Sequence, residues 1–139
     1  MKRWARRSGV LVAAMTAGVL GAGGQAQAEL PPKNVGWLYT LGSSGAVFFD
    51  ADLAGYPSEE KITVCDNKTD GRGIAAIVTG TPAGGAAGAD WVYSFDPSND
   101  GKCESAHGNF FADGYAVTVH VFEYWGENTA ADAWGAGVA

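Results

Sequence analysis

The chain has 139 residues, 21 of them glycine, and a formal net charge of −6, so it offers room for one small domain. Beyond residue 28 it carries 5 basic against 15 acidic residues, a net charge of −10 that argues against binding to nucleic acid or anionic lipid. The glycine-rich composition and the lack of a sustained helical period exclude a helical bundle, a DNA-binding module and a membrane channel.

Residues 1–28 have the pattern of a cleavable secretory signal. A basic start is followed by an apolar stretch that ends near Leu20 and is too short to span a bilayer. Ala26 and Ala28 supply the small side chains that signal peptidase requires, which makes Glu29 the first mature residue. We therefore expect a secreted, extracellular protein with no membrane attachment after cleavage. The alternative is a short N-terminal membrane anchor.

Short segments of alternating or β-branched residues recur after residue 34, separated by turn formers such as Asp70-Gly71 and Asp113-Gly114. In chain order the predicted strands are Val35–Thr40, Gly45–Asp50, Lys61–Asp66, Gly73–Thr79, Asp90–Phe95 and Tyr115–Trp125, with a last short strand through Trp134. Strands of this length and spacing predict an all-β fold, a small antiparallel β-sandwich that occupies residues 29–139 as a single domain.

Cys65 and Cys103 are the only cysteines of the chain. An even pair in an exported domain predicts a disulfide, and this one would close a loop of 38 residues. Chain entropy assigns such a loop about 4 kcal/mol of stabilisation. A cysteine-based catalytic or metal site is the weaker alternative, because the two thiols lie far apart in sequence and form no CxxC motif.

The longest predicted strand alternates strictly, and its two faces differ in character. One face is apolar and suits the sandwich core: Tyr115, Val117, Val119 and Val121. The other face combines a hydroxyl group, an imidazole and two aromatic rings: Thr118, His120, Phe122 and Tyr124. Full burial of its polar groups would leave them without partners, so we expect this face to be partly wet. We predict His120, Phe122 and Tyr124 as the binding residues, able to stack on a sugar or to anchor a protein.

The segment Asp90–Phe95 also alternates, with three aromatic side chains on one face: Trp91, Tyr93 and Phe95. We expect these three rings to belong to the core.

Candidate sites for catalysis, metals or cofactors are weak, and we predict none. The two histidines, His107 and His120, lack the ligand spacing of a zinc site. The segment Asp96–Gly101 resembles the start of an EF-hand loop, but the twelfth position is His107 instead of glutamate, which favours an ordinary turn. Asp50 and Asp52 form a pair of carboxylates that we interpret as solvated turn residues rather than as a glycosidase pair.

Several short motifs resemble those of a group of small secreted actinobacterial proteins. They are a Phe-bearing strand, a Val-x-Asp strand, an Asp-Gly-Arg-Gly turn and a Trp-x-x-Gly-x-Ala end, found at Gly45–Asp50, Ile62–Asp66, Asp70–Ala76 and Trp134–Ala139. The resemblance implies a small β-sandwich and adds no catalytic residues.

The sequence therefore predicts a secreted, non-catalytic binding protein whose partner is an extracellular protein or a glycan. The alternative is a small secreted hydrolase, which would gather a histidine with carboxylates in one pocket, or a protease-inhibitor-like effector. An inhibitor would present a rigid convex loop, and the disulfide-closed segment 65–103 is the candidate.

Overall fold

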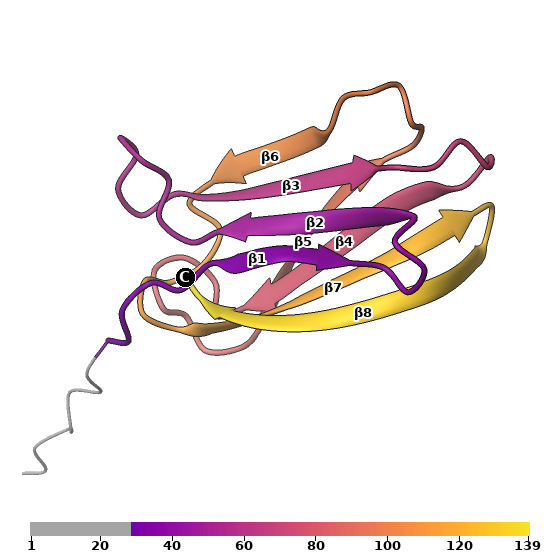
Figure 1. Ribbon diagram of the computed structural model, residues 1–139. Helices are drawn as coiled ribbons and strands as arrows, with labels where there is room; N and C mark the ends of the chain where they lie inside the picture. The colour runs from indigo at the N-terminus through magenta and orange to yellow at the C-terminus, as the bar shows by residue number, and fades with distance from the viewer. Residues whose placement is uncertain (1–28) are drawn as a thin grey trace, which may run out of the picture.

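The computed structural model describes residues 29–139, which form β-strands and contain no α-helix. The strands are β1 (Val35–Tyr39), β2 (Gly45–Asp50), β3 (Glu60–Asp66), β4 (Gly73–Gly80), β5 (Asp90–Asp96), β6 (Glu104–Gly108), β7 (Ala116–Trp125) and β8 (Asn128–Val138). They form two antiparallel sheets, in the orders β1-β2-β3-β6 and β5-β4-β7-β8 (Figure 1). The predicted antiparallel β-sandwich is confirmed. The predicted signal peptide, residues 1–28, lies outside the described residues.

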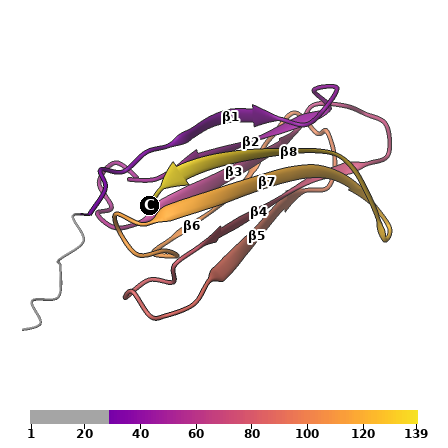
Figure 2. The same ribbon diagram turned by 90° about the horizontal axis from the view of Figure 1, so that it is seen from below.

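The longest hairpin joins β7 to β8 through Gly126 and Glu127 (Figure 2). A two-residue hairpin connection needs positive φ angles, and Gly126 has a φ of 57°. The ten residues of β7 and the eleven of β8 therefore run as one long ribbon along the second sheet.

The core lies between the two sheets, where each strand turns its apolar residues inward. Fully buried side chains include Val47, Phe49, Ile62 and Val64 from the first sheet and Ile74, Val78, Val117, Val119 and Val121 from the second. Phe111, in the connection from β6 to β7, is also part of this core. The prediction for the valines of β7 is confirmed, whereas Tyr115 precedes the strand and is exposed.

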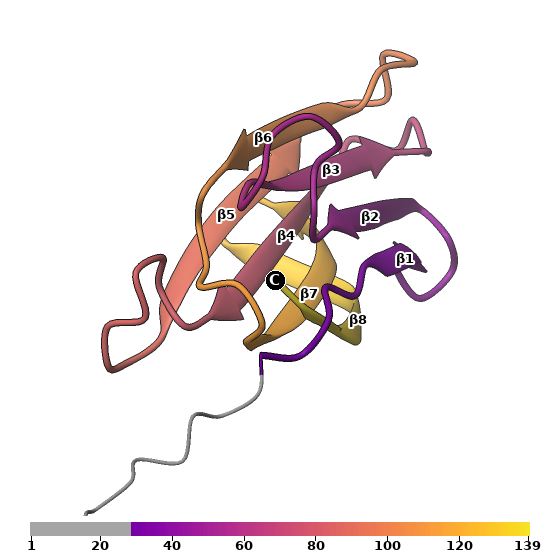
Figure 3. The ribbon, with the colours of Figure 1, turned by 90° about the vertical axis from the view of Figure 1, so that its left-hand side faces the viewer.

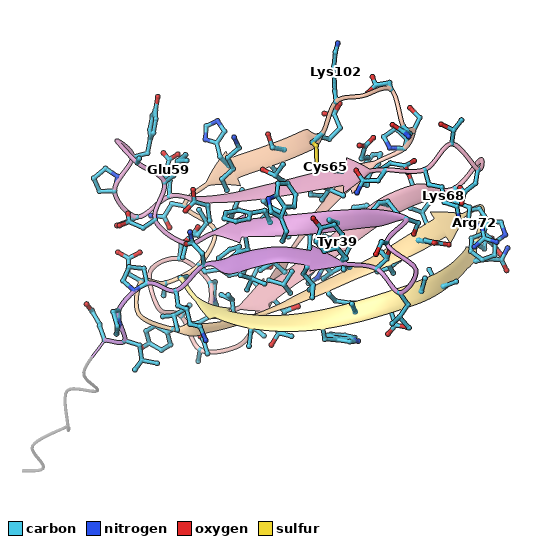
Figure 4. All side chains as sticks on the ribbon, in the orientation of Figure 1. Tyr39, Glu59, Cys65, Lys68, Arg72 and Lys102 are labelled. Atoms are coloured by element: carbon cyan, nitrogen blue, oxygen red, sulfur yellow. A yellow bond between two sulfur atoms is a disulfide. The ribbon has the colours of Figure 1, made fainter. Side chains whose placement is uncertain are left out.

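The predicted disulfide between Cys65 and Cys103 is present and joins β3 to the start of β6 (Figure 4). Val64 and Glu104, the residues next to the two cysteines, are paired across the same two strands. The disulfide therefore fastens β6 at the edge of the first sheet.

One side of the sandwich is closed by backbone contacts between the sheets. Lys33 and Val138 exchange two backbone hydrogen bonds, of 2.9 and 3.0 Å, and the Leu41 N–H donates to the Ala131 carbonyl at 2.8 Å. Figure 3 shows the sandwich from the end at which the chain finishes, with β1 beside β8. The outer face of the second sheet is left without a covering element among the described residues.

Candidate functional site

Rings from three strands gather on the outer side of the second sheet, and we call this surface the aromatic face. Its members are Trp91, Tyr93 and Phe95 of β5, His120, Phe122 and Tyr124 of β7, and Trp134 of β8.

The expectation that the β5 rings belong to the core is wrong. Trp91 is 64% exposed, and Tyr93 and Phe95 are also exposed. The opposite face of β5 points inward instead, and there the buried Asp96 carboxylate accepts hydrogen bonds from the backbone N–H groups of Asp66 and Ser98. Because these bonds satisfy the carboxylate, β5 can bury its polar face and leave its rings in water.

Strand β4 carries small residues beneath the rings of its neighbouring strands. A Cβ atom on Gly73 would lie 2.6 Å from the Tyr124 ring, so Tyr124 lies directly over this glycine. Ala75 pairs with Phe95 on one side and Phe122 on the other and is fully buried beneath them. Phe95 and Tyr124 therefore meet edge to face across β4, with ring centroids 6.3 Å apart.

The three predicted binding residues all lie on the outer side of β7, but their exposure differs. His120 and Tyr124 are half-buried. Phe122 is only 7% exposed, because the His120 ring packs against it with centroids 4.8 Å apart and Ala75 lies beside it. The expectation of a wet Phe122 is therefore wrong, and this ring forms the floor of the surface.

Strand β8 completes the face with Trp134, which is 61% exposed and pairs with His120 across the ladder. The two rings are stacked, with centroids 3.7 Å apart and planes within 4°. The pairing register between β7 and β8 shifts just beyond this point: Val121 pairs with Ala133, whereas Glu123, two residues later, pairs with Ala130, three residues earlier. This shift inserts one extra residue into β8 as a β-bulge.

The bulge borders a shallow depression in the aromatic face. It is lined by Ile77, His120, Phe122, Thr129, Ala130 and Asp132. Asp132 accepts a hydrogen bond of 3.1 Å from the Trp134 indole N–H, and its Oδ2 lies 3.8 Å from His120 Nε2. His120 Nε2 is buried and has no hydrogen-bond partner within residues 29–139.

The aromatic face is nearly free of charge. Burial lowers the pKa of His120 below its ordinary value of 6.5, which outweighs the opposing effect of Asp132, so the imidazole is neutral at neutral pH. The outward-facing positions of β5, β4, β7 and β8 contain no lysine or arginine. Asp132 is the acidic side chain near the centre of the aromatic face. The surface therefore suits a ligand that brings apolar faces and hydroxyl groups rather than a charge.

The second histidine is not part of this surface. His107 lies on β6 of the other sheet, where its Nδ1 is 3.2 Å from the Glu59 carboxylate. The two histidines are therefore not brought together, and each has one acidic neighbour. Residues 29–139 contain no group of three or more His, Cys, Asp or Glu side chains arranged to hold a metal ion.

The disulfide-closed segment 65–103 is not a single convex loop. It contains the whole of β4 and β5, and β4 is central in the second sheet. The segment as a whole therefore does not form the single convex loop that the inhibitor alternative calls for.

Sequence reasoning missed Asp132 and Trp134 as members of the site. Their spacing of two places both on one face of a strand, but the surrounding Ala and Gly residues have low strand propensity and hid most of β8.

No helix capable of crossing a bilayer occurs in the part of the chain that the structure describes. No protein-family model, curated protein or solved structure matches this chain.

Proposed function

We propose that this protein is a secreted, non-catalytic binding protein whose aromatic face holds a neutral glycan. The observation that carries the proposal is the layer of exposed, uncharged rings on the outer side of β5-β4-β7-β8. Monomeric soluble proteins rarely expose contiguous apolar patches of large size, and such patches mark binding surfaces.

Rings of this kind suit the apolar faces of sugars. The C–H bonds on one side of a pyranose ring meet the electron-rich face of an aromatic ring favourably. Trp91 and Trp134 are the most exposed rings and stand on opposite edge strands of the sheet. One row of paired residues crosses the second sheet from β5 to β8 and consists of Tyr93, Ile77, His120 and Trp134. Strands about 4.8 Å apart give this row a span of about 14 Å, enough for a short oligosaccharide.

Polar groups between the rings favour a glycan over a protein partner. Thr79 and Thr118 pair across β4 and β7 next to the ring row, and Asp132 and His120 Nε2 lie within it. Sugar hydroxyl groups both donate and accept, so they can satisfy such scattered groups along the whole face. The net charge of −10 beyond residue 28 neither attracts nor repels a neutral glycan, whereas it would favour basic proteins over acidic ones as partners.

Secretion is supported by two independent features. The leader pattern of residues 1–28 predicts export, and the Cys65–Cys103 disulfide is typical of an oxidising compartment. N-terminal sequencing of material from culture medium should begin at Glu29, and protein that begins at Met1 would contradict export by signal cleavage.

The test of the proposed function is retention on insoluble polysaccharides and on a glycan array. Trp91→Ala and Trp134→Ala should weaken binding about tenfold or more, because each removes one stacking ring. Trp37→Ala is the matched control, since Trp37 is 48% exposed on the other sheet. Equal losses in all three variants, or capture of a basic protein and no glycan, would contradict the proposal.

The pair of His120 and Asp132 supports one alternative, a small hydrolase that uses the imidazole as a general base. Neither cysteine is free to act as a nucleophile, because both are in the disulfide. Incubation of each bound glycan with the protein separates the two functions. Release of reducing ends that His120→Gln abolishes would favour the hydrolase.

A further inference from the structure

The bulge of β8 is anchored to the rest of the fold at Ala131. Ala131 has a φ of 55°, a left-handed conformation that is costly for a residue with a side chain. Its carbonyl accepts the hydrogen bond from Leu41 that closes the sandwich, so the surrounding fold maintains this conformation. The bulge places Asp132 beside His120, and bulges commonly redirect side chains at binding sites.

The Asp132 carboxylate and the His120 imidazole offer two neighbouring polar atoms that one hydroxyl group can bridge. Asp132 Oδ2 and His120 Nε2 are 3.8 Å apart, which is too long for a direct hydrogen bond. A hydroxyl oxygen can lie within hydrogen-bond distance of both atoms at once, donating its hydrogen to the carboxylate and accepting from the imidazole in the tautomer that carries its proton on Nε2. It would satisfy the buried His120 Nε2, which is otherwise unpartnered within the described residues.

The remaining walls of the depression suit the body of a sugar. Phe122 and Ile77 give it an apolar floor, and Thr129 adds a hydroxyl group at its rim. A pyranose ring offers both kinds of surface, with C–H bonds on its face and hydroxyl groups around its edge.

We infer that this depression is the specificity subsite of the aromatic face and takes one neutral pyranose ring, with one hydroxyl held between Asp132 and His120. The inference rests on the proposed glycan binding and names the position that distinguishes one sugar from another. A uronic acid is disfavoured, because its carboxylate would face Asp132.

The same geometry makes the subsite sensitive to acid. Asp132 on β8 is the charged group that faces His120, whereas Ile77 on β4 and Phe122 on β7 do not titrate. When His120 takes up a proton, the imidazolium is drawn to the Asp132 carboxylate and occupies the acceptor that the hydroxyl needs. Because burial holds the His120 pKa below 6.5, binding is complete at neutral pH and falls in the acid range.

The test uses methyl glycosides of glucose, galactose and mannose and their monodeoxy analogues, titrated against the full protein by calorimetry. We expect one glycoside to bind best, and removal of a single hydroxyl to cost about tenfold in affinity. Asp132→Asn and His120→Gln should remove this discrimination. His120→Gln should also abolish the fall in affinity that the native protein shows as the pH drops below 6.5. The matched controls are Glu59→Gln and His107→Gln, which alter the histidine–carboxylate pair on the other sheet.

The outcomes separate the subsite from the face that contains it. Polysaccharide retention that survives in Asp132→Asn, with sugar discrimination lost, supports the subsite. Retention with discrimination and pH dependence unchanged in both variants overturns the subsite and leaves the proposed function standing. Absence of any retention by the native protein overturns the proposed function itself. A preference for a cationic amino sugar that salt abolishes would also overturn the neutral subsite, because Asp132 would then act as a counter-ion. Unchanged melting temperatures show that both variants are folded.

Discussion

The Arg72 guanidinium donates a hydrogen bond of 2.5 Å to the buried Glu123 carboxylate. Glu123 also accepts a hydrogen bond from the Ser44 hydroxyl, which lies in the turn between β1 and β2 of the other sheet. Arg72 in turn lies over the Trp125 ring, 4.2 Å from its centroid, at the hairpin end of β7 (Figure 4). The two sheets are therefore joined through one ion pair and one hydroxyl group.

Arg72→Met should destabilise the protein by about 2–3 kcal/mol, measured by urea unfolding. Loss of one partner of a fully buried pair costs about 3–5 kcal/mol, and the figure is lower here because the Arg72 side chain is 42% exposed. Lys68→Met is the control, since its pair with Asp70 is 3.7 Å long and exposed, and should change stability by less than about 0.5 kcal/mol. Similar losses in both variants would show that the burial of Glu123 is immaterial.

The pH dependence of this ion pair has a definite sign. The Ser44 hydroxyl, with the Arg72 guanidinium, holds the pKa of Glu123 below its ordinary value of 4.5 despite burial. Its stabilisation is therefore present above pH 4.5 and is lost as the pH falls through the lowered pKa. The difference in unfolding free energy between the native protein and Glu123→Gln should shrink at acid pH. A difference that stays constant from pH 7 to pH 3 would contradict this linkage.

Glu60→Gln should stabilise the protein at neutral pH and raise its Tm by a few degrees. Glu60 is fully buried, one carboxylate oxygen accepts from the Phe110 N–H, and Oε1 has no partner within the described residues. Burial, aided by Asp113, raises its pKa above 4.5. The protonated Glu60 side chain therefore contributes fully to stability below pH 4.5, and this contribution is lost as the pH rises through the raised pKa. Melting curves at about pH 4 and pH 7 check this, because the gain must be larger at pH 7. A Tm that falls at pH 7 would mean that the charged form is required.

The double variant Cys65→Ser and Cys103→Ser should lose about 4 kcal/mol, because the disulfide closes a segment of 38 residues. The loss should be felt most in β6, an edge strand held by β3 and by this bond. Hydrogen exchange should therefore accelerate in Glu104–Gly108 before it does in β7. Uniform acceleration across both sheets would contradict a local role for the bond.

Alternation in the sequence predicted most of the strands, and its failures have physical reasons. The bounds of Gly45–Asp50 match β2, and Tyr115–Trp125 differs from β7 by one residue. Strand β6 was missed because Glu104–Gly108 contains no large apolar residue. Its pairing with β3 and the disulfide at Cys103 hold it in place. These are tertiary constraints that local propensity does not contain.

Alternation also groups side chains by face without stating which face points inward. On β7 the three valines identified the inward face, and the polar Thr118 and His120 identified the outward face. On β5 the three rings made the wrong face look apolar. The inward Asp96 is satisfied by backbone N–H groups of Ser98, two residues away, and of Asp66, thirty residues away, and the latter contact cannot be read from the local sequence. The binding residues of β7 could thus be proposed from the sequence, whereas the contributions of Trp91 and Trp134 could not.

Gly73→Ala should weaken glycan binding while leaving the fold nearly intact. The new Cβ would lie 2.6–2.8 Å from the atoms of the Tyr124 ring, so the ring must move and its edge contact with Phe95 is lost. Because a side-chain ring can shift more easily than backbone, the cost in stability should be about 1 kcal/mol, at the low end for an overpacked site. Gly36→Ala is the control, since a Cβ there meets nothing within 4 Å. Isothermal titration with the best glycan should then show weaker binding for Gly73→Ala alone. If both variants bind the glycan as tightly as the native protein does, the contact between Phe95 and Tyr124 over β4 is not needed for binding. Glycan binding would then depend on β8 and its bulge.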